Sequence, residues 1–158
     1  MVEDSQTRVR LISELLVDTL RISGKTRLRV FGTSMLPAVW PGDEVALDGA
    51  MLIPAVGEIV MFSRHGRLFI HRVVERRTCN GETELVTRGD ALAECDPPIK
   101  LDQVLGRVIA IRRHGRPVPL NPKCPSVSMR MVGRAVRAGS RLRRAILKLH
   151  TIRARTYA

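Results

Sequence analysis

The sequence predicts a mainly antiparallel β domain with an amphipathic helix before it and a basic helical tail after it. Three observations indicate this. Apolar residues recur at helical spacing near the N-terminus, short apolar or alternating runs lie between turn signals in the middle, and the last segment combines helical spacing with many arginines. The 158 residues are enough for one domain with a core of its own. We expect three parts: a helix and lead-in at 1–26, the β domain at 27–121 and the tail at 122–158.

The first element is predicted as a helix over about 7–21. Its apolar residues recur at helical intervals: Val9, Ile12, Leu16 and Leu20, flanked by Leu11 and Leu15. The run Ser23-Gly24-Lys25 ends the pattern. We expect this helix to pack its apolar face on the β domain rather than to cross a membrane.

From Arg27 onward the period changes from helical to alternating. The predicted strands are 27–31, 43–48, 57–63, 67–76, 82–88 and 104–112. Tight turns are predicted between some of them, at Arg64-His65-Gly66, Asn80-Gly81 and His114-Gly115. Strands joined by such short turns pair in antiparallel fashion, which favours a mainly antiparallel β domain.

The distribution of charge and the lack of a long apolar run indicate where in the cell the protein is expected and what it is expected to contact. The formal net charge is +12, but residues 1–122 hold 17 Lys or Arg against 15 Asp or Glu, whereas residues 123–158 hold 10 against none. No run approaches the roughly 18 apolar residues of a membrane span, and the N-terminus lacks the apolar stretch of a signal peptide. These features predict a cytoplasmic protein, with peripheral membrane contact through the tail as a further expectation.

The cysteines favour neither a disulfide framework nor a zinc site. Cys79, Cys95 and Cys124 are odd in number and show no C-x-x-C spacing. Three free thiols fit a reducing compartment. The sequence therefore predicts no metal and no cofactor.

Ser34 is a candidate nucleophile in the first turn-rich stretch of the β domain. It lies on a small-residue turn, where Gly32 leaves room for a reacting carbonyl while Pro37 and Pro41 bend or stiffen the chain. A turn of this composition is also common in ordinary loops. Taken alone, it does not establish catalysis.

His71 is a candidate general base on a predicted strand. Strand alternation places Phe69, His71 and Val73 on one face, so the histidine has apolar neighbours. Such a histidine is usually a core residue with satisfied hydrogen bonds, and its surroundings alone do not decide its role. An imidazole near a serine can take the hydroxyl proton during attack, and an ordinary histidine pKa near ~6.5 suits that task with little adjustment.

Two acids, Asp90 and Asp96, lie in the loop RGDALAECD. A carboxylate that faces the second ring nitrogen of a histidine base fixes its tautomer and stabilises the imidazolium formed in the reaction. Either acid could instead cap backbone amides of a turn. The residues themselves do not choose between these roles.

Four segments occur in a specific order along the chain. They are GTSMLPAVWPGD at 32–43, GEIVMFSRHGRLFIHRVVER at 57–76, TRGDALAECD at 87–96 and VLGRVIAI at 104–111. Over about 28–111 this order resembles the signal peptidase I and LexA-type serine peptidases, most closely the signal peptidases in which histidine replaces lysine as the base. The resemblance implies a signal-peptidase-like antiparallel β domain.

The same resemblance implies the roles of the candidate residues. Ser34 would be the nucleophile and His71 the general base, because the base of this family lies just before an Arg-Val-Val stretch. Asp96 would orient the histidine, and Asp90 would be a structural or supporting acid. The expected reaction is hydrolysis of a peptide bond through an acyl-enzyme intermediate.

Residues next to the nucleophile are expected to shape the substrate site. Gly32 allows close approach, and Met35 and Pro37 match the Ser-Met-x-Pro pattern of the family. The backbone N–H of Ser34 would contribute to the oxyanion hole. Some family members have a serine hydroxyl where this chain has Gly32, so the second donor is open.

The expected function is that of a serine endopeptidase acting on a polypeptide, either in signal peptide processing or on a precursor or leader peptide. In membrane-bound signal peptidases a transmembrane helix precedes the nucleophile, and here a polar-faced helix stands in that place. Two alternatives remain: a LexA-like regulator that cuts itself and binds nucleic acid, and a binding module without activity. No helix-turn-helix is evident before the β domain, which makes nucleic acid the less favoured partner.

The tail after Asn121 forms a predicted basic amphipathic helix. Its apolar residues lie between arginines at helical spacing: Met129, Val132, Val136, Leu142, Ile146 and Leu149. This pattern is typical of helices that lie on anionic membrane surfaces. Binding to nucleic acid, docking on an acidic partner and a solvated appendage remain open.

Overall fold

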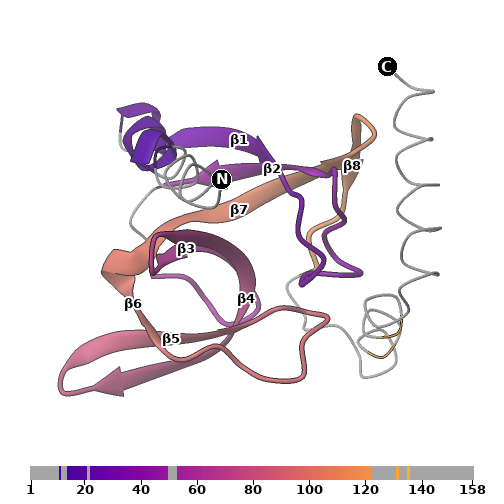
Figure 1. Ribbon diagram of the computed structural model, residues 1–158. Coiled ribbons are helices and arrows are strands. Elements are labelled where there is room, and N and C mark those ends of the chain that lie inside the picture. Colours follow the sequence, from indigo (N-terminus) through magenta and orange to yellow (C-terminus); the bar gives the residue numbers. More distant parts are fainter. Residues whose placement is uncertain are drawn as a thin grey trace, which may run out of the picture.

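One antiparallel sheet forms the body of the protein (Figure 1). The computed structural model describes residues 11, 14–20, 22–49, 53–121, 131 and 135. A mainly antiparallel β domain was predicted, and this is confirmed. In chain order the elements are β1 (Lys25–Arg29), β2 (Glu44–Asp48), β3 (Ile59–Arg64), β4 (Arg67–Cys79), β5 (Glu82–Arg88), β6 (Ile99–Lys100), the 3₁₀ turn η1 (Leu101–Gln103), β7 (Val104–Arg113) and β8 (Arg116–Val118).

The strands follow the order β1-β2-β7-β3-β4-β5-β6, with β8 paired to β7 outside that path. Every pairing is antiparallel. Strand β7 is therefore central, because it pairs with both β2 and β3 and joins the two halves of the sheet. Figure 1 shows the sheet curling strongly through β3 and β4.

Three tight turns fall at the predicted places. Each is a residue followed by glycine, and each connects paired strand ends. Both residues of each pair have positive φ: His65 (49°) and Gly66 (68°), Asn80 (50°) and Gly81 (80°), His114 (50°) and Gly115 (75°). Two consecutive positive φ values give the turn whose twist matches that of paired strands, and glycine adopts them without strain.

Two apolar clusters fill the curled sheet. The first gathers side chains from β1, β2, β3 and β7 with the helical segment and the loop after β1. The second gathers Val60 and Phe62 of β3, Val73 of β4, Leu85 of β5 and Ile99 of β6. Strand β4 contributes to both, because alternate side chains point to opposite faces of a strand.

The N-terminal helical segment packs on the first cluster. Helical residues are 14–20 with 11, 22 and 23, and Leu20 is buried while Leu16 packs against the cluster. Leu11 and Leu15 are exposed, so only part of the predicted apolar stripe faces the sheet. Residues 7–10, 12, 13 and 21 of the predicted helix lie outside the described part. Within that part, no helix has both the length and the apolar character needed to cross a membrane.

Two short strands were not predicted. Strand β6 has two residues and follows Pro97-Pro98, and β8 has three and contains Pro117. Such short runs carry no periodic signal, and proline fits a strand only at an edge. The predicted tail at 122–158 lies outside the described residues, apart from Met131 and Ala135, which are helical.

Candidate active site

The loop between β1 and β2 presents Ser34. Its two ends are joined by backbone hydrogen bonds, from Val30 N–H to the Asp43 carbonyl (2.9 Å) and from Gly42 N–H to the Val30 carbonyl (2.6 Å). A further bond, from Val39 N–H to the Met35 carbonyl (2.9 Å), closes a turn just after the serine. The loop is therefore fixed at its base and within its span.

A buried carboxylate braces the same loop. Asp43 is fully buried and accepts hydrogen bonds from the backbone N–H of Trp40 (2.8 Å) and from Nε and Nη2 of Arg113 (3.0 and 2.8 Å). The Arg113 guanidinium also lies 5.6 Å from the centre of the Trp40 ring, and the indole N–H donates to the Pro37 carbonyl (2.9 Å). Charge-assisted bonds of this kind are strong, so β7 holds the loop through Arg113.

Three side chains from separate segments meet in a continuous hydrogen-bonded chain. Ser34 Oγ lies 3.1 Å from Nε2 of His71 on β4. The other ring nitrogen, Nδ1, lies 2.6 Å from Oδ2 of Asp96, in the loop after β5. With the proton on Nδ1, the imidazole donates to the carboxylate and accepts from the serine hydroxyl. This is the arrangement of a nucleophile, a base and an orienting acid.

Two aromatic rings lie next to the imidazole, and one of them, Phe69, is among the apolar neighbours that strand alternation predicted. His71 is buried, with Phe62 and Phe69 ring centres 6.0 and 5.9 Å from its own. A bulge between Val73 and Glu75 interrupts the β4–β5 pairing just after the histidine. Bulges of this kind redirect side chains next to functional sites.

Opposing effects act on the Asp96 carboxyl. Burial by itself would raise its pKa, but hydrogen bonds from His71 and Thr87, together with the positive charges of His71 and Arg64, outweigh burial and hold the pKa below its ordinary value. The carboxyl group therefore stays ionised beside the imidazole, which is the state needed to stabilise an imidazolium.

Asp90 belongs to a different cluster. Its two oxygens accept hydrogen bonds from Nε and Nη2 of Arg72 (2.9 and 2.8 Å), and both side chains are buried. Nη1 of Arg72 donates to the carbonyls of Gly57 (2.7 Å) and Asn121 (2.8 Å). Arg72 follows His71 on β4 and points to the opposite face, so Asp90 braces the strand without touching the imidazole. A direct part of Asp90 in the reaction is not supported.

The three residues expected at the substrate site have different surroundings. Gly32 is exposed, and a Cβ added there would meet no atom within 4 Å. Pro37 is half-buried, and its peptide bond with Leu36 is cis. Met35, by contrast, is buried in the first apolar cluster, so its side chain supports the loop from inside and does not line an open pocket.

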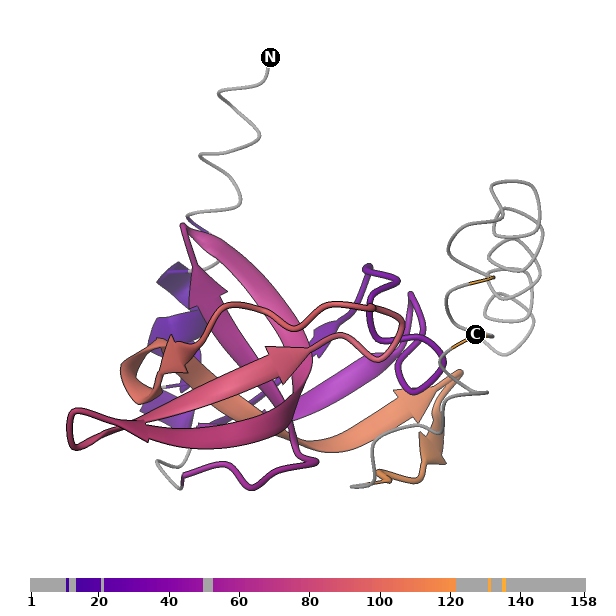
Figure 2. The ribbon, with the colours of Figure 1, turned by 90° about the horizontal axis from the view of Figure 1, so that it is seen from below.

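The loop after β5 also holds the backbone of Ser34. The Ser34 carbonyl accepts a hydrogen bond from the N–H of Ala91 (2.8 Å). A Cβ at Gly89 would come within 2.7 Å of the same carbonyl, so glycine is required for this close approach. Figures 1 and 2 show the loop that follows β1 and the loop that follows β5 side by side at one end of the sheet.

The Ser34 N–H group is available for an oxyanion. Among the described residues, it donates no hydrogen bond to another protein group. A free backbone donor beside a candidate nucleophile is what a developing oxyanion would require. The second donor stays open.

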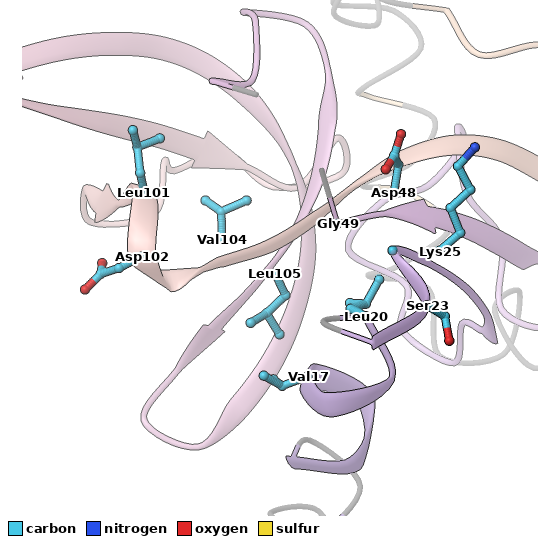
Figure 3. A pocket seen from close by; sticks show the side chains of 11 residues that line it. Val17, Leu20, Ser23, Lys25, Asp48, Gly49, Leu101, Asp102, Val104 and Leu105 are labelled. Atoms are coloured by element: carbon cyan, nitrogen blue, oxygen red, sulfur yellow. The ribbon is translucent and has the colours of Figure 1, made fainter. Parts of the chain in front are cut away.

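A groove elsewhere on the surface carries no comparable group of side chains. It lies between the helical segment and the start of β7 and has a volume of ≈ 880 Å³ (Figure 3). Val17 and Leu20 on one side and Val104 and Leu105 on the other line much of it. In the described ranges, no three His, Cys, Asp or Glu side chains are grouped to hold a metal ion.

Two residues that hold the candidate acids were not predicted. Thr87 donates to Asp96 within the site, and Arg72 holds Asp90 in the separate buried pair. The signal for Thr87 was a polar residue at an inward position of a predicted strand. For Arg72 it was the arginine next to the histidine, whose charge must be paired if the strand is buried on both faces.

No protein-family model matches the chain, and no curated protein matches it either.

Proposed function

We propose that the protein is a serine endopeptidase of the signal peptidase type, a hydrolase that cuts a precursor or leader polypeptide through an acyl-enzyme. The observation that carries the proposal is the unbroken chain of contacts from Ser34 Oγ through His71 to Asp96. Residues from three segments far apart in sequence meet with the spacing that proton transfer requires. Two of the four motif segments form β3, β4 and β7 of one antiparallel sheet, and the other two form most of the loops that carry Ser34 and Asp96, in keeping with a signal-peptidase-like fold.

The geometry supports a two-step reaction. Ser34 Oγ attacks the carbonyl carbon of the scissile bond while His71 Nε2 takes the hydroxyl proton, and the Ser34 N–H donates to the oxyanion. His71 then gives that proton to the leaving amine, and the C–N bond breaks. In the second step His71 takes a proton from water as the water oxygen attacks the ester carbonyl, then gives that proton to Ser34 Oγ as the bond between Oγ and the carbonyl carbon breaks, which releases the acid product and regenerates the serine.

The alignment of all three groups favours this chemistry over a merely structural contact. A histidine that only stabilised the fold would need a hydrogen-bond partner on its far nitrogen, but it would not need a serine hydroxyl aligned on the other. The aligned carboxylate matters when the imidazole becomes charged, which happens as it takes the serine proton. The half-exposed position of Ser34 leaves the hydroxyl open to substrate.

The proposal is tested by incubating the protein with a diverse peptide mixture and identifying the products by mass spectrometry. We expect cleavage by the wild type, none by Ser34→Ala, and a loss of about 10²- to 10⁴-fold in His71→Ala. Ser23→Ala and His65→Asn are matched controls, because both residues are exposed and lie outside the site. Cleavage that survives in Ser34→Ala would overturn the proposal, and intact-mass analysis distinguishes self-cleavage from cleavage of added peptide.

A further inference from the structure

Asp96 is held from two sides by Thr87. The Thr87 hydroxyl donates to Oδ2 of Asp96 at 2.7 Å, and this is the same oxygen that faces Nδ1 of His71 at 2.6 Å. The backbone of the pair is joined too, because Asp96 N–H donates to the Thr87 carbonyl at 2.7 Å. Thr87 therefore holds Asp96 at two points: its side chain binds the carboxylate, and its main-chain carbonyl binds the backbone N–H.

The position of Thr87 in the sheet explains why its hydroxyl serves this purpose. Thr87 on β5 pairs with Val73 on β4, and Val73 shares a strand face with His71. Thr87 is fully buried, and a buried hydroxyl must form a hydrogen bond to offset its lost hydration. The carboxylate of Asp96 is the acceptor that the structure provides.

Asp96 needs such a partner because it is not on a strand. It lies in the irregular segment between β5 and β6, where no sheet ladder fixes the main chain. An acid there has side-chain freedom that a single bond to His71 would leave partly unrestrained. A second bond from a residue locked in the sheet removes that freedom.

We propose that Thr87 is a positioning residue of the site: its hydroxyl fixes the Asp96 carboxylate, which in turn fixes the tautomer and orientation of His71. This inference rests on the proposed function for its kinetic consequence. The hydrogen bond from Thr87 also favours the ionised acid, and so helps to hold the pKa of Asp96 below its ordinary value against the effect of burial.

The kinetic test compares Thr87→Val, which keeps the shape and removes the donor, with Thr87→Ser, which keeps the donor. The readout is the rate at which a fluorophosphonate probe labels Ser34 in the full-length protein. We expect about 10- to 100-fold slower labelling in Thr87→Val and a rate within about threefold of wild type in Thr87→Ser. Should Thr87→Val fail to fold, Thr87→Ala takes its place, since it also lacks the donor, with the same expected order.

A double-mutant cycle separates positioning from general support of the fold. If Thr87 acts through Asp96, then Thr87→Val has no further effect on labelling in an Asp96→Ala background. Equal slowing by Thr87→Val in both backgrounds would overturn the inference, as would wild-type labelling by Thr87→Val alone.

A ground-state measurement keeps this inference distinct from the proposed function. The ring Nδ1–H of His71 gives an NMR signal whose position reports its hydrogen bond to the carboxylate. We expect that signal to shift or broaden in Thr87→Val and to stay in place in Thr87→Ser. Absence of labelling in the wild type would end the proposed function, whereas an unchanged Nδ1–H signal in Thr87→Val would end the positioning role.

Discussion

Asp90 and Asp96 lie six residues apart in sequence, and their different surroundings indicate different roles. Asp90 is 3% exposed and bound at both oxygens by Arg72. The Asp96 side chain is 16% exposed and shares one oxygen between His71 and Thr87. The first pairing offsets a buried charge, whereas the second holds an imidazole in place. We therefore expect loss of the Asp90 carboxylate to change mainly stability and loss of the Asp96 carboxylate to change mainly activity.

Asp90→Asn should lower stability and Asp96→Asn should lower activity. Removing one charge of a buried pair leaves the other uncompensated, so we expect Asp90→Asn to reduce the free energy of unfolding by about 3 kcal/mol. Asp96→Asn should cost less than about 1 kcal/mol in stability, while slowing peptide cleavage by roughly 10²- to 10⁴-fold. Urea unfolding and cleavage assays on both variants check this, and equal losses of stability would remove the distinction.

Stability should depend on the ionisation of Asp96 at acid pH. Its pKa in the folded protein is below the ordinary value of 3.8, so the unfolded chain binds this proton more readily. The stabilisation is therefore present above about pH 4 and is lost as pH falls through the lower, folded-state pKa. Urea unfolding of wild type and Asp96→Asn at several pH values between 6 and about 3 should show the wild type losing its advantage. An advantage that grows as pH falls would contradict the assignment.

At the scale of elements, strands and turns were predictable because their signals are local. Each positive-φ turn contains glycine, and six strands showed periodic or apolar runs. The site was predictable only through ordered motifs, which indicated Ser34, His71 and Asp96 as partners. The Thr87 and Arg72 contacts depend on the β4–β5 register and its bulge, which alternation does not specify. The burial of Met35 likewise depends on how one turn is closed.

The loops after β1 and β5 meet where Gly89 lies against the Ser34 carbonyl, and this close approach gives a prediction for Gly89. Gly89→Ala would place a Cβ 2.7 Å from the Ser34 carbonyl and 3.0 Å from Leu92, so the backbone of the nucleophile must move. We expect fluorophosphonate labelling to slow by about 10²-fold. Gly49→Ala is the control, because its Cβ would meet its neighbours at 3.4 Å or more, an ordinary contact. Labelling of Gly89→Ala at the wild-type rate would show that this approach is not needed.

At the scale of the whole molecule, charge is separated along the chain. Residues 1–122 are almost neutral, and residues 123–158 carry ten basic residues without an acid. The site lies in the nearly neutral β domain, so the tail is expected to affect where the protein acts more than how it reacts. We expect an anionic membrane surface as the partner of the tail, because its sequence places apolar residues at helical spacing between arginines.

The tail predicts salt-sensitive binding to anionic vesicles. Each Lys or Arg near such a surface contributes about 1 kcal/mol, and screening weakens this as salt rises. We expect the full-length protein to co-sediment with anionic but not neutral vesicles at low salt, and a chain ending at Asn121 to remain in solution. Tight binding to duplex DNA without vesicle binding would contradict the membrane assignment. Binding to neither would indicate a tail that serves another partner or none.

The most direct test of the account is the site of fluorophosphonate labelling in the full-length protein and the dependence of its rate on His71. The central claim is that His71 activates Ser34, which predicts a single adduct on Ser34 and a labelling rate that depends on the imidazole. Ser34→Ala should give no adduct, and His71→Ala should lose most of the rate. An adduct on another residue, or labelling of Ser34 that is unchanged in His71→Ala, would contradict the claim.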